Sequence, residues 1–208
     1  MVMVIRKLSE NLKMIYLCID TAYKYLSLSL IKDKQIIAAY DEICFKHQSE
    51  ELFVRLKEIY DKAGISPLDI DAICISKGPG SYTGVRIAMT LAKTIGDVSD
   101  IDIYTISTLR LYANNKPDTL VLMDAKGNRA YNGLYDQGSC IIEDNVAYLD
   151  DLKTEGHDLV GDLSLLGKED FYYPISECFL NNIEYFEKVE DVSGLVPNYL
   201  KENKEYLK

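Results

Sequence analysis

Three apolar stretches with the spacing of β-strands open the main part of the chain. Residues 14–20, reading MIYLCID, form a continuous apolar run that is typical of a buried strand. Apolar and polar residues then alternate over 25–30 and again over 35–40, and the polar residues 32–34 between these two runs suit a hairpin turn. Three successive strands joined by short turns predict an antiparallel meander.

Helical spacing replaces this alternation after the meander. One face of residues 49–63 gathers the apolar side chains of an amphipathic helix, namely Leu52, Phe53, Leu56, Ile59, Tyr60 and Ala63. Ser49 is expected to cap this helix and Gly64 to end it. Strands and helices then alternate: a buried strand at 72–76, a helix at 84–96, a strand at 101–106 and a short helix capped by Ser107. The order β-β-β-α-β-α-β-α predicts an α/β fold with helices packed on a mixed sheet.

A second unit begins after the polar linker at 114–117. Residues 119–135 read as a strand, a turn and a return strand, which repeats the opening of the first meander in a shorter form. The pattern weakens beyond this point, and we expect a small strand-rich lobe with a helix near 179–190. The predicted organisation is an N-terminal extension at 1–13, a first lobe at 14–115 and a second, smaller lobe at 116–208.

Charge distinguishes the two predicted lobes. The formal net charge is −10, yet residues 1–115 hold 14 basic and 14 acidic residues whereas residues 116–208 hold 9 and 19. An acidic lobe repels phosphate backbones, so RNA binding by this chain unaided is disfavoured. The simpler explanation of the acidity is a solvated, solubilising surface.

Cysteine usage and hydropathy bear on the compartment. The chain has 5 cysteines without any Cys-x-x-Cys pair, which favours a reducing cytosol over a disulfide scaffold. No apolar run approaches the ~20 residues that a membrane-spanning helix needs, and the first 13 residues lack the apolar core of a secretory signal. We expect a cytoplasmic protein without membrane association.

The motif with the highest density of constrained residues is GPGSYTGVR at 78–86. Its spacing fits neither a P-loop, since no Lys follows the glycines, nor the G-x-G-x-x-G dinucleotide motif. Gly78 and Gly80 permit positive φ angles, Pro79 stiffens the turn, and Ser81 or Thr83 can cap the next helix. The free N–H groups of that helix start could hold a carboxylate or phosphate. The alternative is simply a tight connection from strand to helix.

The helix that follows this loop is apolar around most of its circumference. Arg86, Thr90 and Lys93 interrupt the apolar cover, and a surface helix needs just one apolar stripe. Gly84, Ala88 and Ala92 form a track of small residues along which another helix could approach. The helix is therefore either sandwiched within its own lobe or, with the helix at 49–63, part of a docking surface.

Candidate catalytic residues are few. His47 and His157 are the only histidines, and no spacing of His and Cys matches a zinc site. His47 precedes the first helix, where a capping or surface role is the default. Asp20 and Thr21 end the first strand of one meander and Asp124 ends that of the other. Carboxylates so placed can hold a metal-bound nucleotide or merely form turns.

Taken together, these motifs are similar to the bacterial TsaB (YeaZ) family over residues 14–135. The matching segments are Ile19 to Ala22, His47, the GPGSYTGVR loop and Ser107 to Leu109, in the same order and spacing. Three weaker matches follow, at Asp124-Ala125-Lys126, at Tyr131 and at Pro197-Asn198-Tyr199-Leu200-Lys201. Lys126 and Lys201 stand where the family has Arg. Residues 128–130 depart from the family pattern, which leaves the role of that turn open.

The resemblance implies an actin-like, Hsp70-like (RNase H-like) fold of two lobes with mixed sheets and a reduced second lobe. It also implies a non-catalytic subunit, without a catalytic or metal-ligating residue, that activates the threonylcarbamoyl transferase TsaD by forming a heterodimer with it. The P-loop ATPase TsaE would join the assembly, and tRNA would bind only through the complex. No cofactor is expected on this chain alone, and ATP or ADP is left to the assembled complex. An apolar helix pair would also allow the isolated chain to homodimerise.

The resemblance assigns residues to three groups. The expected partner interface consists of Leu52, Phe53, Leu56, Tyr60, Tyr82, Val85, Arg86, Ala88, Met89 and Ala92. The family loop consists of Gly78, Pro79, Gly80, Ser81, Thr83 and Gly84. The degenerate phosphate-loop positions are Asp20, Thr21 and Asp124.

Two other functions compete with a scaffold role. A free-standing ATPase or sugar kinase of the same fold is suggested by Asp20, Thr21 and Asp124. Against it, the segment Asp20-Thr21-Ala22 lacks the glycine that such phosphate loops commonly place after the Asp. A metalloprotease, an activity attached to relatives of the fold, has little support because the chain lacks a metal-ligand motif.

Overall fold

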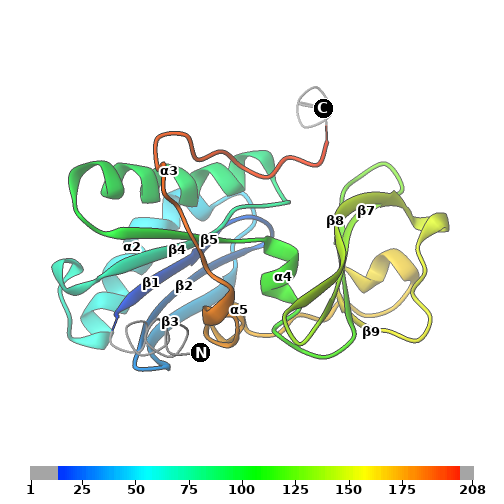
Figure 1. The fold of residues 1–208 in the computed structure, drawn as a ribbon, viewed down its shortest axis with the longest axis horizontal. Helices are drawn as coiled ribbons and strands as arrows, with labels where there is room; N and C mark the ends of the chain where they lie inside the picture. The colour runs from blue at the N-terminus through cyan, green and yellow to red at the C-terminus, as the bar shows by residue number, and fades with distance from the viewer. Residues whose placement is uncertain (1–13, 202–208) are drawn as a thin grey trace.

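Two sheets organise the chain, one in each lobe (Figure 1). The computed structural model describes residues 14–201. The first sheet has the strand order β10-β5-β4-β1-β2-β3, and the first three strands form the expected antiparallel meander while β4 and β5 run parallel to β1. Its strands are β1 (Tyr16–Asp20), β2 (Tyr25–Lys32), β3 (Gln35–Ile43), β4 (Ala72–Ser76), β5 (Asp102–Ile106) and β10 (Glu187–Lys188).

Both faces of this sheet are covered because its central strands are apolar on both sides. In β1, Leu17 and Ile19 point to one core, whereas Tyr16 and Cys18 point to the other. The first core lies under α2 (Gln48–Ala63) and α3 (Tyr82–Val98), and the second under α4 (Thr108–Tyr112) and α5 (Ile175–Asn181). A strand buried on both faces needs no polar alternation, which explains the continuous apolar run in the sequence.

The helix ends follow the expected capping chemistry with one exception. Ser81 caps α3 by accepting a hydrogen bond from the Gly84 amide at 3.2 Å, and Ser107 caps α4 in the same way. Gly64 ends α2 in the left-handed conformation at φ 67°. The expectation that Ser49 caps α2 is wrong, because the helix begins one residue earlier and its N-cap is His47.

The second lobe repeats the meander in reduced form, as expected. β6 (Thr119–Asp124), β7 (Arg129–Asp136) and β8 (Ser139–Tyr148) pair antiparallel, and β9 (Asp158–Gly161) adds to β6 in parallel. Short 3-10 turns complete the two lobes, at Pro67–Asp69, Leu149–Asp151, Leu163–Leu166 and Ile183–Tyr185. This topology confirms an α/β, actin-like arrangement of two mixed sheets with a smaller second lobe.

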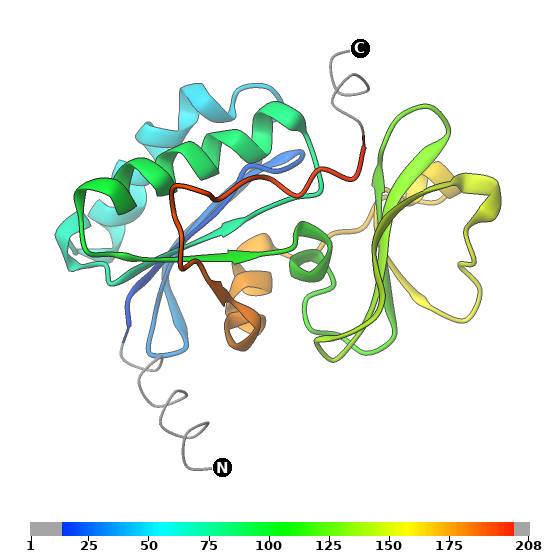
Figure 2. The ribbon, with the colours of Figure 1, turned by 45° about the horizontal axis from the view of Figure 1, so that its top comes forward.

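Within the expected second lobe, residues 116–208, the C-terminal elements that the structure describes contact the first sheet. The helix expected near 179–190 overlaps α5 only at residues 179–181, because a 3-10 turn and β10 follow, and α5 packs on the first sheet rather than on the second. β10 then pairs with the edge strand β5, and residues 189–201 follow α3 toward the gap between the lobes (Figures 1 and 2). The returning segment pairs with the edge of β5, and its Phe186 packs against Tyr16. Both contacts cover parts of the first sheet that would otherwise be open.

Two expectations from the sequence concern the N-terminal extension and membrane association. The predicted extension at 1–13 lies outside the residues that the structure describes. Within residues 14–201, every helix is too short or too polar to span a membrane.

Candidate functional site

The loop at 78–84 lies directly on the turn that follows β1. A Cβ atom on Gly80 would come within 2.2 Å of the Ala22 carbonyl oxygen, and one on Gly84 within 2.2 Å of the Thr21 carbonyl oxygen. Gly78 has a φ of +98°, as expected, but Gly80 does not have a positive φ. Glycine is therefore required at positions 80 and 84 by close backbone approach and not by dihedral angle.

The side chains of Thr21 and Asp20 form hydrogen bonds within the protein itself. The Thr21 hydroxyl donates to the Gly84 carbonyl at 2.7 Å and accepts from the Ala88 amide at 3.2 Å. Asp20 is 0% exposed and accepts hydrogen bonds from the Tyr112 hydroxyl at 2.7 Å, the Ala22 amide at 2.9 Å and the Ser76 hydroxyl. Burial raises the pKa of Asp20, although these hydrogen bonds act in the opposite direction. The turn after β1 thus offers neither side chain to a ligand.

A cleft of about 900 Å³ separates the two lobes next to this turn. Asp124 lies in it, partly exposed, and accepts hydrogen bonds from the Lys126 amide at 2.7 Å and from the Lys126 ammonium group. Burial tends to raise the pKa of Asp124, but the contacts with Lys126 outweigh it and lower the pKa. Of the three expected phosphate-loop positions, only Asp124 therefore faces the cleft.

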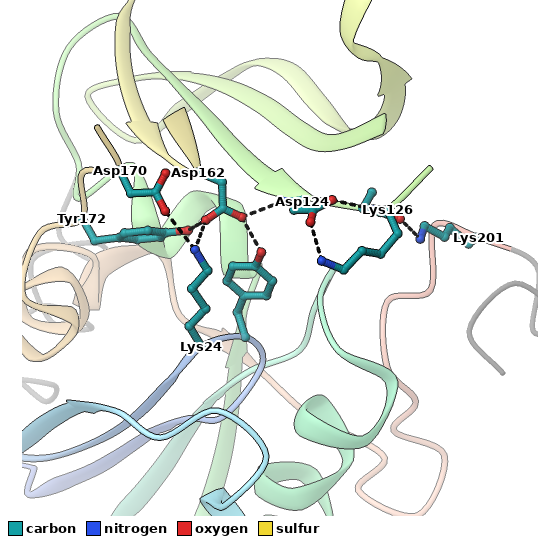
Figure 3. A network of polar contacts seen from close by, with 9 residues as sticks. Lys24, Asp124, Lys126, Asp162, Asp170, Tyr172 and Lys201 are labelled. Atoms are coloured by element: carbon teal, nitrogen blue, oxygen red, sulfur yellow. Dashed lines mark hydrogen bonds and ion pairs between the residues drawn. The ribbon is translucent and has the colours of Figure 1, made fainter. Parts of the chain in front are cut away.

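A polar network that the sequence did not predict crosses this cleft. Asp162, which follows β9, contacts Tyr23 and Lys24 of the first lobe and Tyr172 of the second (Figure 3). Lys24 also contacts Asp170 at 3.0 Å. Asp162 directly follows β9, a strand of only four residues. Recognising this short strand in the sequence would have been the one way to place Asp162 at a strand end.

An apolar groove of about 560 Å³ lies between α2 and α3. Phe53 is 66% exposed at its edge, and the half-buried side chains of Ile87 and Leu91 form part of its lining. Its full lining is Ser49, Leu52, Phe53, Tyr82, Thr83, Arg86, Ile87, Thr90, Leu91 and Thr94. Tyr82 and Thr83 line both the groove and the cleft, so the two hollows adjoin.

Part of the expected partner interface is buried in the core instead. The accessible members are Phe53, Tyr82 and Arg86, while Leu52 reaches the groove although it is almost fully buried. The others are buried among the core side chains, namely Leu56, Tyr60, Val85, Ala88, Met89 and Ala92. The expectation that the track of small residues meets a partner is therefore corrected. Gly84 meets the Thr21 backbone, and Ala88 and Ala92 are 0% exposed.

The segment at 197–201, whose motif the sequence analysis singled out, fastens the loop to the second lobe. The Asn198 amide donates to the Lys77 carbonyl at 2.7 Å, and the Tyr199 ring stacks on Tyr82 with centroids 5.2 Å apart. The Arg86 guanidinium donates to the Tyr199 hydroxyl at 2.7 Å. Lys201 then donates to the Ala125 carbonyl on the other side of the cleft.

Neither histidine lines the cleft or the groove. His47 is exposed and contacts Glu50 at 3.0 Å, while His157 contacts Asp118 at 2.7 Å in the second lobe. Among residues 14–201, no three His, Cys, Asp or Glu side chains are grouped so that they could hold a metal ion.

The fold and the site define a class of protein: an actin-like, two-lobed chain in which the polar side chains of the turn after β1 are hydrogen-bonded to the protein itself. Comparisons with known proteins narrow this class. The family model for TsaD, tRNA N6-adenosine threonylcarbamoyltransferase, matches residues 26–195. The tRNA threonylcarbamoyladenosine biosynthesis protein TsaB of Bacillus subtilis is 31% identical over 218 aligned residues, which cover 90% of this chain and 94% of that protein. The chain belongs to the TsaB (YeaZ) family.

Two further likenesses agree with this assignment. TsaB of Escherichia coli is 30% identical over 121 residues, which cover 55% of this chain and 52% of that protein. The solved structure of YeaZ from Pseudomonas aeruginosa covers 90% of this chain at a TM-score of 0.77 and 19% identity, and this chain covers all of it. At that identity the structural likeness establishes the fold alone.

Proposed function

We propose that this chain is a non-catalytic scaffold subunit for the transfer of a threonylcarbamoyl group to the adenosine next to the tRNA anticodon. In this proposal it acts by binding and activating the catalytic subunit TsaD. The observation that carries the proposal is the apolar groove between α2 and α3, with Phe53 exposed at its edge. A concave apolar surface that residues 14–201 leave open favours association with another protein. The near full-length similarity to TsaB of Bacillus subtilis supports the pathway.

The chemistry expected of the partner follows from the lining of the groove. Its lining is apolar or uncharged apart from Arg86, so its occupant should present an apolar helix face rather than a charged segment. The family model that matches this chain is named for TsaD and spans both α2 and α3. Two related subunits could therefore pair through corresponding helices, which is the usual logic of a twofold interface. In the absence of TsaD, a second copy of this chain would compete for the same groove.

The state of the first phosphate turn supports the non-catalytic part of the proposal. Asp20 and Thr21 would present oxygen atoms to a ligand in a working phosphate turn, but here both are bound to the protein's own groups. The transfer chemistry is accordingly assigned to TsaD. TsaE and tRNA would join the assembly through the complex, with ATP or ADP bound there. The free cysteines, three of them buried, fit a reducing cytosol.

Reconstitution tests the proposal directly. The full chain is mixed with TsaD, TsaE, ATP, threonylcarbamoyl-adenylate and tRNA, and the modified nucleoside is quantified. We expect formation of the product to depend on this chain and a heterodimer with TsaD to elute as one peak in size exclusion. Equal product in reactions without this chain would refute the proposal.

The competing function, a free-standing ATPase or kinase, predicts that the isolated chain binds and hydrolyses ATP. Calorimetry of the isolated chain with ATP and Mg²⁺ would then show tight binding, and turnover would follow. We expect neither, because a γ-phosphate bound at the first turn would have to displace the hydrogen bonds that Asp20 and Thr21 already make.

A further inference from the structure

The side chain of Asp162 is an anion held almost out of reach of solvent between the two lobes. It is 2% exposed, and its two carboxylate oxygens accept four hydrogen bonds. Oδ2 accepts from the Tyr23 hydroxyl and from the Asp124 amide at 2.7 Å. Oδ1 accepts from the Lys24 ammonium group and from the Tyr172 hydroxyl at 2.7 Å. Figure 3 shows these donors converging on the carboxylate from both sides of the cleft.

This set of donors has the chemistry of a site for a small oxyanion. It combines one ammonium group, two phenolic hydroxyls and one main-chain amide, which together satisfy a negative charge without a second charged side chain. Burial alone would lower the pKa of Lys24, but the contacts with Asp162 and Asp170 outweigh it and raise the pKa. The ammonium group therefore stays charged beside the carboxylate.

The location of the donors is as informative as their identity. Tyr23 and Lys24 belong to the turn after β1, and the amide of Asp124 ends β6, so three of the four donors come from the equivalent strand ends of the two meanders. The protein does not need a bound molecule to join these two turns, because Asp162 joins them from within the second lobe.

We propose that Asp162 is a built-in anion that occupies an oxyanion site between the lobes and thereby holds the cleft together without a bound phosphate group. The site accepts a free oxyanion such as inorganic phosphate only when the carboxylate has been removed. This inference rests on the donors around Asp162 and is independent of the groove between α2 and α3.

Chemical rescue tests the proposal with the full-length chain. Thermal unfolding is followed for the wild type and Asp162→Ala in increasing inorganic phosphate, with sodium chloride at matched ionic strength as the reference. We expect Asp162→Ala to melt at a lower temperature than the wild type. Phosphate should then raise its midpoint in a saturable way, by roughly 5–10 °C at a hundred times the dissociation constant. The wild type should show only the small, non-saturable rise that phosphate gives to proteins in general.

Two variants make the result specific to this site. Asp170→Ala also removes a carboxylate from Lys24 but leaves Asp162 in place, so it should show no saturable response to phosphate. Lys24→Ala combined with Asp162→Ala should lose most of the rescue. Equal phosphate responses in the wild type and Asp162→Ala would overturn the proposal, as would an unchanged melting temperature of Asp162→Ala.

Calorimetry covers the case in which Asp162→Ala does not fold. Inorganic phosphate is then titrated into the wild type and into Lys24→Ala. We expect no binding heat with the wild type. Saturable binding to the wild type that Lys24→Ala abolishes would show that the site is open with Asp162 present, and it would refute the proposal.

Discussion

Thr21 and Gly84 interlock two segments that are 63 residues apart in the sequence. The Thr21 hydroxyl donates to the Gly84 carbonyl at 2.7 Å, while the Thr21 carbonyl oxygen would lie 2.2 Å from a Cβ atom on Gly84. The start of α3 is therefore fixed against the end of β1 by a hydrogen bond and by a backbone contact that only glycine allows.

Gly84→Ala should destabilise the protein although alanine is the better helix former. In an ordinary helix the exchange would be favourable by up to about 1 kcal/mol, but here the new methyl group meets backbone that cannot yield cheaply. We expect a net loss of about 1–3 kcal/mol or more in the free energy of unfolding, as for overpacked cores. Urea denaturation measures it. Thr90→Ala, at an exposed position of the same helix, is the control and should be neutral or slightly stabilising.

Thr21→Val should cost about 1–3 kcal/mol, because it leaves the buried Ala88 amide and Gly84 carbonyl without their side-chain partner. Thr21→Ser retains the hydroxyl and loses only a methyl group, so it should be destabilised less. Paired urea curves separate the two effects. If Thr21→Val were as stable as the wild type while Thr21→Ser were destabilised, the methyl packing and not the hydrogen bonds would explain the role of Thr21.

Charge placed in the groove should abolish binding of TsaD without unfolding the chain. Ile87 and Leu91 are half-buried in the lining, so Ile87→Glu or Leu91→Glu would force an unpaired carboxylate into the interface. We expect the affinity to fall by about 100-fold or more, given the 3–5 kcal/mol cost of an uncompensated buried charge. Size exclusion and calorimetry with TsaD measure the loss, and circular dichroism verifies the fold.

Val98→Glu is the matched control for this surface. Val98 ends α3, is 82% exposed and is absent from the groove lining, so the same change of charge should leave TsaD binding intact. If Ile87→Glu bound as well as Val98→Glu, the groove would not be the binding site. Variants of Ala88 are unsuitable for this purpose, since Ala88 is 0% exposed and its replacement by Glu would disrupt the core.

Stability should fall in alkaline solution because buried tyrosines must lose a proton. Burial raises the pKa of Tyr60 to about 12, whereas an unfolded chain releases this proton near pH 10. The folded state thus favours the neutral phenol, and the stability that this preference contributes below pH 10 is lost as the pH rises from 10 to 12. The linkage between unfolding and proton release by Tyr60 lowers the free energy of unfolding by roughly 2 kcal/mol at pH 12.

Denaturation at pH 8, 10 and 11 checks this prediction, with tyrosinate absorbance as a second signal. Tyr60→Phe should reduce the alkaline loss, whereas Tyr148→Phe, at a side chain that is 56% exposed, should leave it unchanged. Identical alkaline profiles for wild type and Tyr60→Phe would contradict the assignment.

The elements with strong local periodicity could be predicted, and the reason is visible in the core. β1 reads as a continuous apolar run because Leu17 and Cys18 enter different cores, and α2 shows a single stripe because only one of its faces is buried. Ser81, Ser107 and Gly64 have capping roles that depend on neighbouring residues alone. Local chemistry was enough for these features.

The features that sequence reasoning missed depend on distant partners. β10 has only two residues and exists because Glu187 pairs with Thr105. Asp162 becomes a bridge only because Tyr23 and Tyr172 meet it in space. The apolar residues around α3 are buried on more than one side, as the sequence indicated. Part of their cover comes from Val192 and Leu195, which return to the first lobe from the C-terminal segment. Composition cannot reveal such a distant contact.

The return of the chain to the first lobe after the second has a consequence for its synthesis on the ribosome. The face of the first sheet that carries Tyr16, Cys18 and Cys74 is covered by α4 and α5, and α5 is translated only after the whole second meander. A nascent chain that has reached residue 136 therefore contains β1 to β5 and α4, but not α5, the second helix that covers this face. The first lobe, although it is made first, is completed last, and the emerging chain carries an exposed apolar face throughout the synthesis of its neighbour.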